Sequence, residues 1–379
     1  MAGTSPGNAV AVRCRGPPKF ELQEADHVQR PRPVFHGQVV TVTELYFPFP
    51  VHSEVGHEDY DREAAKWLSR HSDLQQAQLD AIVGSRVAAA TAFLASPANP
   101  ELLKPTAVWS AVYLLTDDVL EAASGEQAAI MAACGQRIWD DPDAPVPNTP
   151  ITAVVQQNAR ELLALATPAQ RQRLRATHQQ YFAAIVTEHL LETVKQPPPV
   201  EVYAGVREAA SIMTAISAVV EFATGMDIPE HEYHSPHVRA FSQAAHLAAS
   251  WVNDVVAFAK DVREGHHNLV TVLAHRSGRD ARATVDDAVA VISSALYAMN
   301  ELSQVLLREG SPALRAYVRS MIRLVGVFIP WQLHSPRYAA VQADEPLTIT
   351  RTPPADAHVP PDIAAIAWWW DHLPVRDAA

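Results

Sequence analysis

The segment Ser250–Gly265, SWVNDVVAFAKDVREG, contains the pattern from which the rest of the chain is interpreted. On a helix, Asn253, Ala257 and Asp261 fall at positions i, i+4 and i+8, so their side chains share one face. The amide and carboxylate oxygens of Asn253 and Asp261 are ligands that a hard divalent cation prefers. Lys260 adds a positive charge for an anion bound to that cation. Because the neighbouring residues are mostly apolar, we expect these polar groups to have partners; a solvent-facing polar stripe is the alternative.

A second group of acidic residues lies in Trp109–Glu121, WSAVYLLTDDVLE. Asp117 and Glu121 are one helical turn apart and share a face, and Asp118 flanks them. Carboxylates crowded at the end of an apolar helix repel one another unless a cation or an arginine neutralises them. Mg²⁺ is usually held by one or two carboxylates together with substrate phosphate oxygens. The spacing therefore favours a magnesium site, with a solvent-facing acidic cluster as the alternative.

The composition indicates a helical protein with a large buried core. The chain has 379 residues, of which 48% are hydrophobic and 19% charged, and only 14 glycines. Its formal net charge of −12 argues against nucleic acid or an anionic membrane as a partner. Cys14 and Cys134 form no zinc-binding pattern, and no uninterrupted apolar run reaches the roughly 18 residues of a membrane span. We therefore expect a cytoplasmic protein without a membrane span.

Helical periodicity extends over most of the chain, and no segment alternates convincingly with period two. We expect one all-α domain over residues 46–340. Residues 1–45 are rich in Pro and Gly and should form a disordered or loosely docked arm, and residues 341–379 should form a C-terminal tail containing Trp368, Trp369 and Trp370. Beyond a first helix from about residue 59, we expect helices at 76–96, 100–123, 125–139, 151–165, 168–194, 199–225, 234–263, 280–309 and 311–335.

The two motifs together resemble the signatures of the bacterial class I terpene synthases, or terpene cyclases. That family carries an aspartate-rich DDxxD/E motif and, later in the chain, a triad of the form NDxx(S/T)xx(K/R)(E/D), which here read DDVLE and NDVVAFAKD. Its diphosphate-sensing arginine lies 46 positions before the triad asparagine, where this chain has Arg207. The segment WQLHSPRY supplies Trp331, Arg337 and Tyr338 of the family's Trp-x5-Arg-Tyr pattern. The resemblance covers about residues 45–340.

The resemblance implies a class I terpenoid synthase-like helical bundle around an apolar active-site cavity. It also implies three Mg²⁺ ions and a linear isoprenyl diphosphate as the substrate. The implied metal ligands are Asp117, Asp118, Glu121, Asn253 and Asp261. The implied contacts to the diphosphate come from Arg207, Lys260, Arg337 and Tyr338. Of these, the residues expected to be catalytic are Asp117, Arg207, Asn253, Asp261, Arg337 and Tyr338.

One position departs from the family pattern. Ala257 stands where a Ser or Thr hydroxyl would be a metal ligand, and its methyl group cannot coordinate. Either water fills the position or the metal binds more weakly; since Mg²⁺ accepts extra waters, we expect an active enzyme. Ala210 and Ser211 follow Arg207 at the offsets where the family has residues that couple diphosphate sensing to ionisation through a helix break.

Ionisation and cyclisation of an isoprenyl diphosphate require a charged rim and an apolar wall in the active-site cavity. Breaking an allylic C–O bond builds negative charge on the diphosphate, which fixed cations stabilise. Aromatic faces stabilise the carbocation inside the cavity. The candidates for the cavity wall are Trp109, Tyr113, Phe222 and Trp331.

Several alternatives stay open at this point. Farnesyl diphosphate, giving a sesquiterpene, is the expected substrate, but small residues in 199–225 would also allow geranylgeranyl diphosphate and a diterpene. A chain-elongating prenyltransferase would need a second DDxxD-type motif, which the triad replaces. A non-catalytic isoprenoid-diphosphate-binding protein is favoured only by Ala257. The resemblance also suggests a homodimer.

Overall fold

The computed structural model of the chain describes residues 44–52, 58–94, 100–334 and 347–374. Its first half contains helices α1 (Glu58–His71), α2 (Gln76–Ser85), α3 (Val87–Leu94), α4 (Pro100–Glu121), α5 (Gly125–Asp140), α6 (Thr152–Leu165) and α7 (Pro168–Glu192). The second half contains α8 (Val200–Ala210), α9 (Met213–Thr224), α10 (Glu230–Tyr233), α11 (Pro236–Val256), α12 (Phe258–Glu264), α13 (Leu269–Ser277), α14 (Val285–Glu309) and α15 (Pro312–His334). The shorter elements are β1 (Glu44–Tyr46), η1 (Arg282–Thr284), β2 (Thr348–Thr350), α17 (Ala364–Ala367) and η2 (Trp368–His372).

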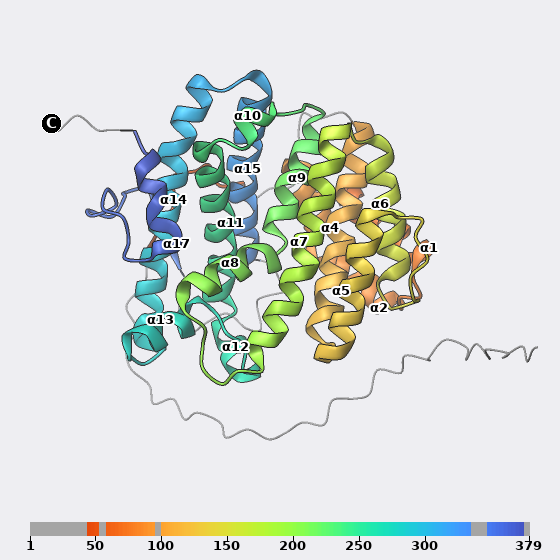
Figure 1. Cartoon of the computed structure of the whole chain (residues 1–379), viewed down its shortest axis with the longest axis horizontal. Helices are drawn as coiled ribbons and strands as arrows, with labels where there is room; N and C mark the ends of the chain where they lie inside the picture. Colours follow the sequence, from red (N-terminus) through yellow and green to blue (C-terminus); the bar gives the residue numbers. More distant parts are fainter. Residues whose placement is uncertain (1–43, 53–57, 95–99, 335–346, 375–379) are drawn as a thin grey trace, which may run out of the picture.

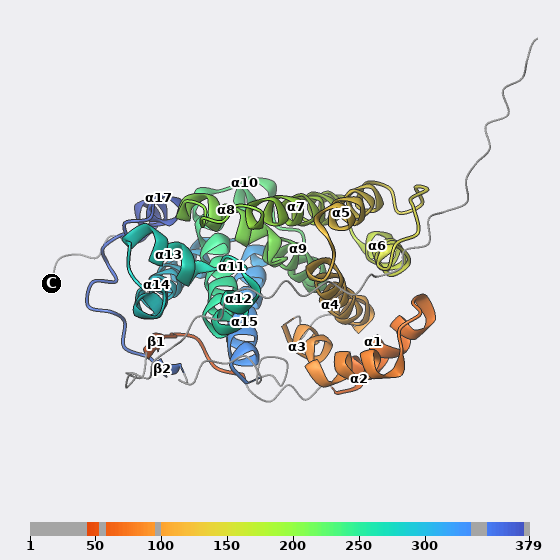
Figure 2. The same cartoon turned by 90° about the horizontal axis from the view of Figure 1, so that it is seen from below.

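The helices form two groups joined by α8 and α9. In one group α11 packs along α14 and α15, and in the other α5 packs along α7, with α4 and α6 nearby (Figure 1). Helices α8 and α9 contact α7 on one side and α11 on the other. Seen from below, β1 and β2 lie on the opposite side of the molecule from α7 and α8 (Figure 2). The all-α class expected from the sequence is confirmed for the described residues.

Local sequence signals fix where many of these helices begin. The Thr167 hydroxyl accepts a hydrogen bond from Gln170 N (3.2 Å), and Pro168 takes the first helical position of α7. In α11, Ser235 and Pro236 play the same two parts. A side-chain oxygen at the N-cap satisfies an amide that has no partner within the helix, and proline there has no amide to satisfy.

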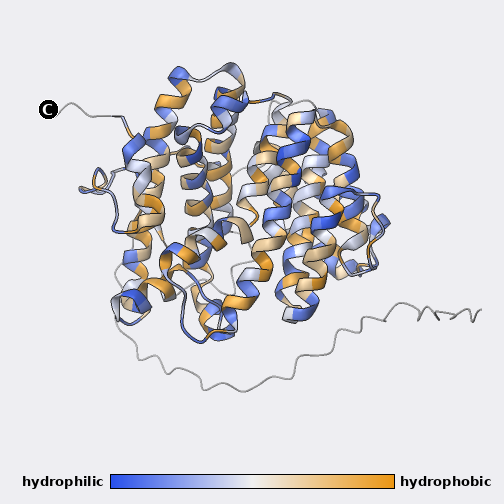
Figure 3. Ribbon diagram, viewed as in Figure 1, coloured by the Kyte–Doolittle hydropathy of each residue, from blue (hydrophilic) through white to orange (hydrophobic). Residues whose placement is uncertain are grey.

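The core lies between the facing sides of the helices. Most helices carry both apolar and polar stretches along their length, as Figure 3 shows. Arg282–Glu309 is the one helix in the described ranges that is long and apolar enough to cross a membrane. Since 72% of its apolar window is buried inside the protein, its composition is explained by its place in the core.

The sequence predicted one continuous helix at 76–96 and another at 199–225, and both predictions are wrong, because each range contains two helices. The first is interrupted at Arg86 and the second at Ile212, and both residues have φ of 62°. This left-handed conformation is unfavourable for a β-branched residue such as Ile212, so helix propensity gives no signal for it. Only the helix break that the family resemblance implies near Ala210 and Ser211 pointed to this region. The predicted helix 234–263 is also divided, and α13 was not predicted at all. Helix propensity is a weak guide to such boundaries, because tertiary contacts can override it.

A parallel strand pair joins the two ends of the described chain and was likewise not predicted. Glu44 pairs with Thr348 and Tyr46 with Thr350. The expected boundary at residue 46 therefore falls inside β1, and residues 1–43 lie outside the described part of the chain. Strands of three residues are too short to show an alternating pattern.

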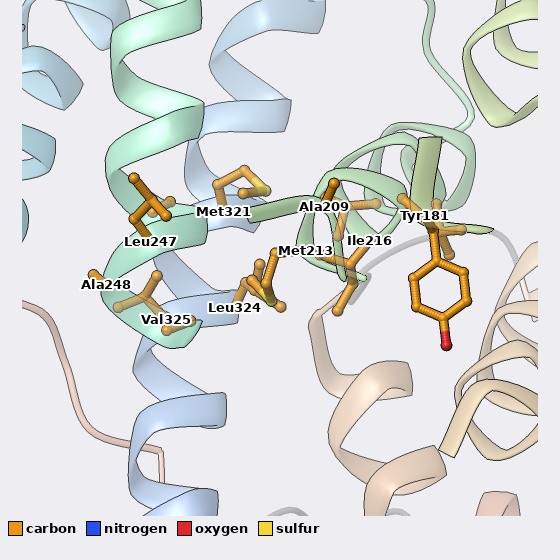
Figure 4. Close-up of a cluster of buried hydrophobic side chains, with 14 of the residues drawn as sticks. Tyr181, Ala209, Met213, Ile216, Leu247, Ala248, Met321, Leu324 and Val325 are labelled. Atoms are coloured by element: carbon orange, nitrogen blue, oxygen red, sulfur yellow. The ribbon is translucent and has the colours of Figure 1, made fainter. Parts of the chain in front are cut away.

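A cluster of buried hydrophobic side chains lies next to α8 and α9. Figure 4 shows side chains from α7, α8, α9, α11 and α15 meeting there. The labelled residues are Tyr181, Ala209, Met213, Ile216, Leu247, Ala248, Met321, Leu324 and Val325. This packing holds the interrupted α8–α9 segment against α11, where the triad motif begins.

Candidate active site

A cavity of about 490 Å³ lies between the C-terminal half of α4, α7, the α8–α9 junction, the α11–α12 junction and α15. Its polar lining includes Asp117, Asp118, Glu121, Glu188, Arg207, Asn253, Lys260 and Asp261. Its apolar and aromatic lining includes Trp109, Tyr113, Ile185, Met213, Ile216, Phe328 and Trp331. Residues of both sequence motifs thus line one cavity, together with three of the four predicted wall aromatics.

The prediction that Phe222 belongs to the wall is wrong. Phe222 is fully buried and does not line the cavity, because α9 directs Met213 and Ile216 toward it instead. Arg337 and Tyr338 lie outside the described residues.

The acidic motif lies at the C-terminal end of α4. Asp117, Asp118 and Glu121 are exposed to solvent at the cavity rim. Glu121 accepts a hydrogen bond from Lys260 of α12, which joins the two motifs across the rim. Burial alone would lower the pKa of Lys260, but the hydrogen bond and charge of Glu121 raise it overall, so the ammonium stays charged.

The triad residues come from the junction of α11 and α12. The single helix expected over 234–263 is interrupted at Ala257, but two backbone hydrogen bonds continue through the interruption. They run from Ala257 N to Asn253 O (2.7 Å) and from Asp261 N to Ala257 O (3.0 Å). These bonds keep the three side chains on one side of the segment, and all three residues line the cavity.

Asp261 is a partly buried carboxylate whose ionised form a bound cation would stabilise. Burial raises the pKa of Asp261 to about 6, and the charge of Asp254 adds to this effect. A hydrogen bond from Asn268 Nδ2 to Asp261 Oδ2 (3.1 Å) acts in the opposite direction. An adjacent metal ion would favour the ionised carboxylate.

Arg207 extends from α8 to the triad motif. Its Nε donates to Asp254 Oδ1 and its Nη2 to Asn253 Oδ1, each at 2.9 Å. Its Nη1 lies 3.9 Å from Glu188 Oε1. Burial alone would lower the pKa of Arg207, but the surrounding carboxylates, Asp254 first among them, raise it. The guanidinium is therefore charged and held beside a predicted metal ligand.

Asp254 is the buried centre of this network and was missed in the sequence analysis. It is 1% exposed, and besides Arg207 it binds the Tyr203 hydroxyl of α8. It also accepts a hydrogen bond from Leu269 N (3.0 Å) at the start of α13. Asp254 thus connects α8, α11 and α13. Its place directly after Asn253, inside an apolar helix, was the available signal, because a buried carboxylate requires partners.

Glu188 of α7 is a second acidic residue that the sequence analysis missed. It lines the cavity, and burial together with nearby carboxylates, including Asp117, raises its pKa to about 7 despite the opposing effect of Arg207. No motif surrounds Glu188 in the sequence, so only the fold brings it to the site.

Two wall aromatics are held by hydrogen bonds on their polar edges. Trp109 Nε1 donates to His178 Nε2 (2.7 Å), and Trp139 Nε1 donates to the Tyr113 hydroxyl (2.6 Å). The rings of Trp139 and His178 stack with their centroids 3.6 Å apart. His178 Nδ1 donates to Leu174 O (2.6 Å), and burial lowers the pKa of His178 to about 3. The neutral imidazole and the indole fix both wall rings.

The rim beside Lys260 also contains His266. Its Nδ1 pairs with Glu192. Within the described ranges, ligand atoms of Glu121, Glu264 and His266 lie within 4.8 Å of one another. Lys260 lies within ion-pair distance of Glu121 and Glu264, so a cation of the protein itself already offsets part of their negative charge.

The arrangement suits an amphipathic anion bound through cations. Carboxylates from α4 and amide and carboxylate oxygens from α11 and α12 supply the oxygen ligands that Mg²⁺ takes. Arg207 and Lys260 add fixed positive charge at the same rim. The apolar wall beyond the rim is suited to a hydrocarbon chain, which it would shield from water.

Comparison with known proteins places this chain in a family. The model described as terpene synthase family 2, C-terminal metal binding, matches residues 108–322. A germacradien-6-ol synthase from Streptomyces pratensis is 24% identical over 88% of this chain and 97% of its own. A 4-epi-cubebol synthase from Streptosporangium roseum, named as cyclising (2E,6E)-farnesyl diphosphate, is 24% identical over 77% of this chain and 90% of its own.

Solved structures show the same fold. A point mutant of the SVS_A2 protein, which was obtained by ancestral sequence reconstruction, is 23% identical with a TM-score of 0.76, and the alignment covers 88% of this chain and 98% of the other. The 2-methylisoborneol synthase from Streptomyces coelicolor, solved with Mg²⁺ and 2-fluoroneryl diphosphate, is 16% identical with a TM-score of 0.70. That alignment covers 81% of this chain and 98% of the other.

Fold, cavity and motifs together define a bacterial class I terpene synthase, an enzyme of the carbon–oxygen lyase class. Since the family model matches more than half of the chain, this protein belongs to terpene synthase family 2, whose C-terminal part binds metal. A terpene cyclase is thereby favoured over a chain-elongating prenyltransferase.

Proposed function

We propose that this enzyme ionises farnesyl diphosphate with the help of Mg²⁺ and cyclises the carbocation to a sesquiterpene. The observation that carries the proposal is the arrangement of the cavity, with both oxygen-rich motifs on its rim and an aromatic wall beyond them. The fifteen-carbon substrate is supported by the 4-epi-cubebol synthase, whose name specifies farnesyl diphosphate. Geranylgeranyl diphosphate is the alternative substrate.

The proposed metal ligands come from both sides of the rim. Asp117, with Asp118 or Glu121, would hold two ions, and Asn253 with Asp261 would hold the third. The donor chemistry fits, since all of these groups offer oxygen atoms. When bound, the ions supply positive charge to the departing diphosphate.

The basic residues of the chain would bind the diphosphate directly. Arg207 donates to Asp254, and Lys260 donates to Glu121. A diphosphate at the rim would accept hydrogen bonds from the remaining N–H groups of both side chains. The C–O bond breaks with its electron pair leaving on the diphosphate, and a double bond of the same chain then attacks the carbocation. The cyclised cation becomes a neutral hydrocarbon by losing a proton, or an alcohol by taking up water and losing a proton. Arg337 and Tyr338 are proposed as further diphosphate contacts from their sequence pattern alone.

The aromatic wall would guide the cyclisation. Trp109, Tyr113 and Trp331 line the cavity with ring systems that attract positive charge. We also propose a cytoplasmic homodimer in which residues 46–340 form the catalytic domain; size-exclusion chromatography with light scattering tests the dimer.

The deciding experiment is an incubation of the purified enzyme with ten-, fifteen-, twenty- and twenty-five-carbon isoprenyl diphosphates, each with Mg²⁺. Gas chromatography with mass spectrometry should show a cyclic product from the fifteen-carbon substrate. EDTA and the Asp117→Ala variant should each abolish it. A cyclic product from only the twenty-carbon substrate would instead establish a diterpene synthase. No conversion of any substrate would contradict the proposal and favour a binding role.

A further inference from the structure

The C-terminal segment docks on the helices that carry the candidate active site. Trp369 of η2 is fully buried, and its Nε1 donates a hydrogen bond to Gln243 Oε1 of α11 (2.9 Å). The indole N–H groups of the other two tryptophans donate within the segment, that of Trp368 to Ala365 O (3.1 Å) and that of Trp370 to Ala357 O (3.2 Å). Of the three indole N–H groups, that of Trp369 is therefore the one that reaches the helical body.

Gln243 also forms a hydrogen bond with α8. Its Nε2 donates to Glu208 Oε2 (2.8 Å), so one side-chain amide accepts from the tail and donates to the carboxylate. The second oxygen of Glu208 accepts a hydrogen bond from His246 Nδ1 (2.9 Å). Glu208 adjoins Arg207, the residue that faces the triad motif, and therefore anchors the end of α8 that presents the guanidinium.

The same network holds both sides of the α8–α9 interruption. His246 Nε2 contacts the Ser217 hydroxyl of α9. The Ser211 and Ser250 hydroxyls lie 2.6 Å apart, and Ser250 Oγ donates to His246 O (2.8 Å). Residues before and after the interruption are thus tied to a single turn region of α11.

The order Ser217, His246, Glu208 resembles a hydrolytic triad, but its setting is unsuited to one. Ser217 and His246 are 5% and 4% exposed, and neither lines the active-site cavity. A substrate therefore has no approach to the hydroxyl from that cavity. Burial alone would raise the pKa of Glu208, but the hydrogen bonds from His246 and Gln243 lower it, so the group is a buried carboxylate held by fixed donors.

We infer that the C-terminal segment takes part in catalysis at a distance: Trp369, through Gln243 and Glu208, positions Arg207 and the α8–α9 interruption for ionisation of the substrate. These three are positioning residues, since none is expected to touch the diphosphate. The inference rests on the proposed function, because positioning of Arg207 has a kinetic effect only if Arg207 acts on a diphosphate. It also gives the second tryptophan of the run a physical role.

The test compares Trp369→Phe with Trp370→Phe. Both variants lose one indole N–H and keep an aromatic ring, but only the first loses a hydrogen bond to the helical body. Trp369→Phe should lower kcat about threefold to tenfold, the size expected for one hydrogen bond, with KM nearly unchanged. Gln243→Leu, which interrupts the network at its centre, should have at least the same effect. Trp370→Phe should match the wild type.

A second measurement keeps the inference separate from the proposed function. Hydrogen–deuterium exchange of residues 200–211 should become faster in Trp369→Phe and Gln243→Leu, and not in Trp370→Phe. Equal kcat values and equal exchange in all variants would overturn the inference. If the wild type converts no isoprenyl diphosphate, the proposed function fails, while unchanged exchange in this segment would independently refute the link from Trp369 to α8.

Discussion

Arg207 Nη2 lies 2.8 Å from Oδ1 of the buried Asp254, and this ion pair joins α8 to α11 at the rim of the cavity. Asp254 also accepts the amide of Leu269, so the pair is part of the contact that fixes the start of α13. One carboxylate therefore orients the cationic group nearest the triad and stabilises the helices around it. A substitution of Asp254 should therefore affect both the orientation of Arg207 and the stability of the fold.

Replacing Asp254 with Asn should destabilise the fold and reduce turnover. The variant keeps the shape of the side chain but leaves Arg207 without its closest negative charge, and removing one partner of a buried ion pair costs about 3 kcal/mol. Urea unfolding should show this loss, and kcat should fall in parallel. The exposed pair of Arg308 and Glu309 provides the control, because Glu309→Gln should change neither quantity. Unaltered stability of Asp254→Asn would contradict the role assigned to this residue.

Restoring a hydroxyl at position 257 should strengthen metal binding. Ala257 lines the cavity in the column between Asn253 and Asp261, and Ser would add one oxygen ligand there. The Mg²⁺ concentration for half-maximal activity should fall about tenfold, which corresponds to about 1.4 kcal/mol. The wild type is itself the control, since it differs only by the missing oxygen. An unchanged Mg²⁺ requirement would show that the site does not use a ligand at this position.

The sequence was sufficient for the helical fold and for the motif residues because those signals are local. Asp117 and Glu121 are one turn apart, and Asn253 and Asp261 are two turns apart, so each pair could be placed on a helix face from spacing alone. Their meeting at one cavity was expected only through the family resemblance.

The remaining features depend on contacts between distant segments. The φ of 62° at Ile212 is imposed by packing, not by that residue's own preference. Phe222 was misplaced because which side of α9 faces the cavity is decided by its neighbours. Glu188 belongs to the site although its own helix carries no motif. Trp369 forms a hydrogen bond with Gln243, which lies 126 positions away in the sequence.

His178 should make stability fall at acidic pH. Burial lowers its folded-state pKa to about 3, whereas an unfolded histidine titrates near 6.5. Below pH 6.5 the unfolded chain therefore binds a proton that the folded chain does not, so stability decreases as the pH falls toward 3. Between pH 7 and pH 5 this group should cost about 2 kcal/mol.

The control for this effect is the variant His178→Gln, which has no titrating group. It should be less stable than the wild type at pH 7 because Trp109 and Leu174 lose well-aligned partners. Urea unfolding at both pH values should show a smaller loss on acidification than in the wild type. His234→Gln, at an exposed position, should leave the wild-type difference intact. An identical pH dependence in His178→Gln would rule out His178 as its source.

Replacing Asp117 should reduce kcat more than replacing Glu121, although both residues belong to the same motif. Asp117 and Glu121 both lie at the exposed rim. Glu121 accepts a hydrogen bond from Lys260. With Asp117 as a proposed metal ligand, Asp117→Asn should lower kcat more than about 100-fold and raise the Mg²⁺ requirement, since an uncharged amide attracts the cation less strongly than the carboxylate that it replaces. Glu121→Gln keeps a hydrogen-bond acceptor for Lys260 and should lower kcat by less than about tenfold. Kinetics at saturating and limiting Mg²⁺ distinguish the two; equal losses would assign Glu121 to the metal instead of to Lys260.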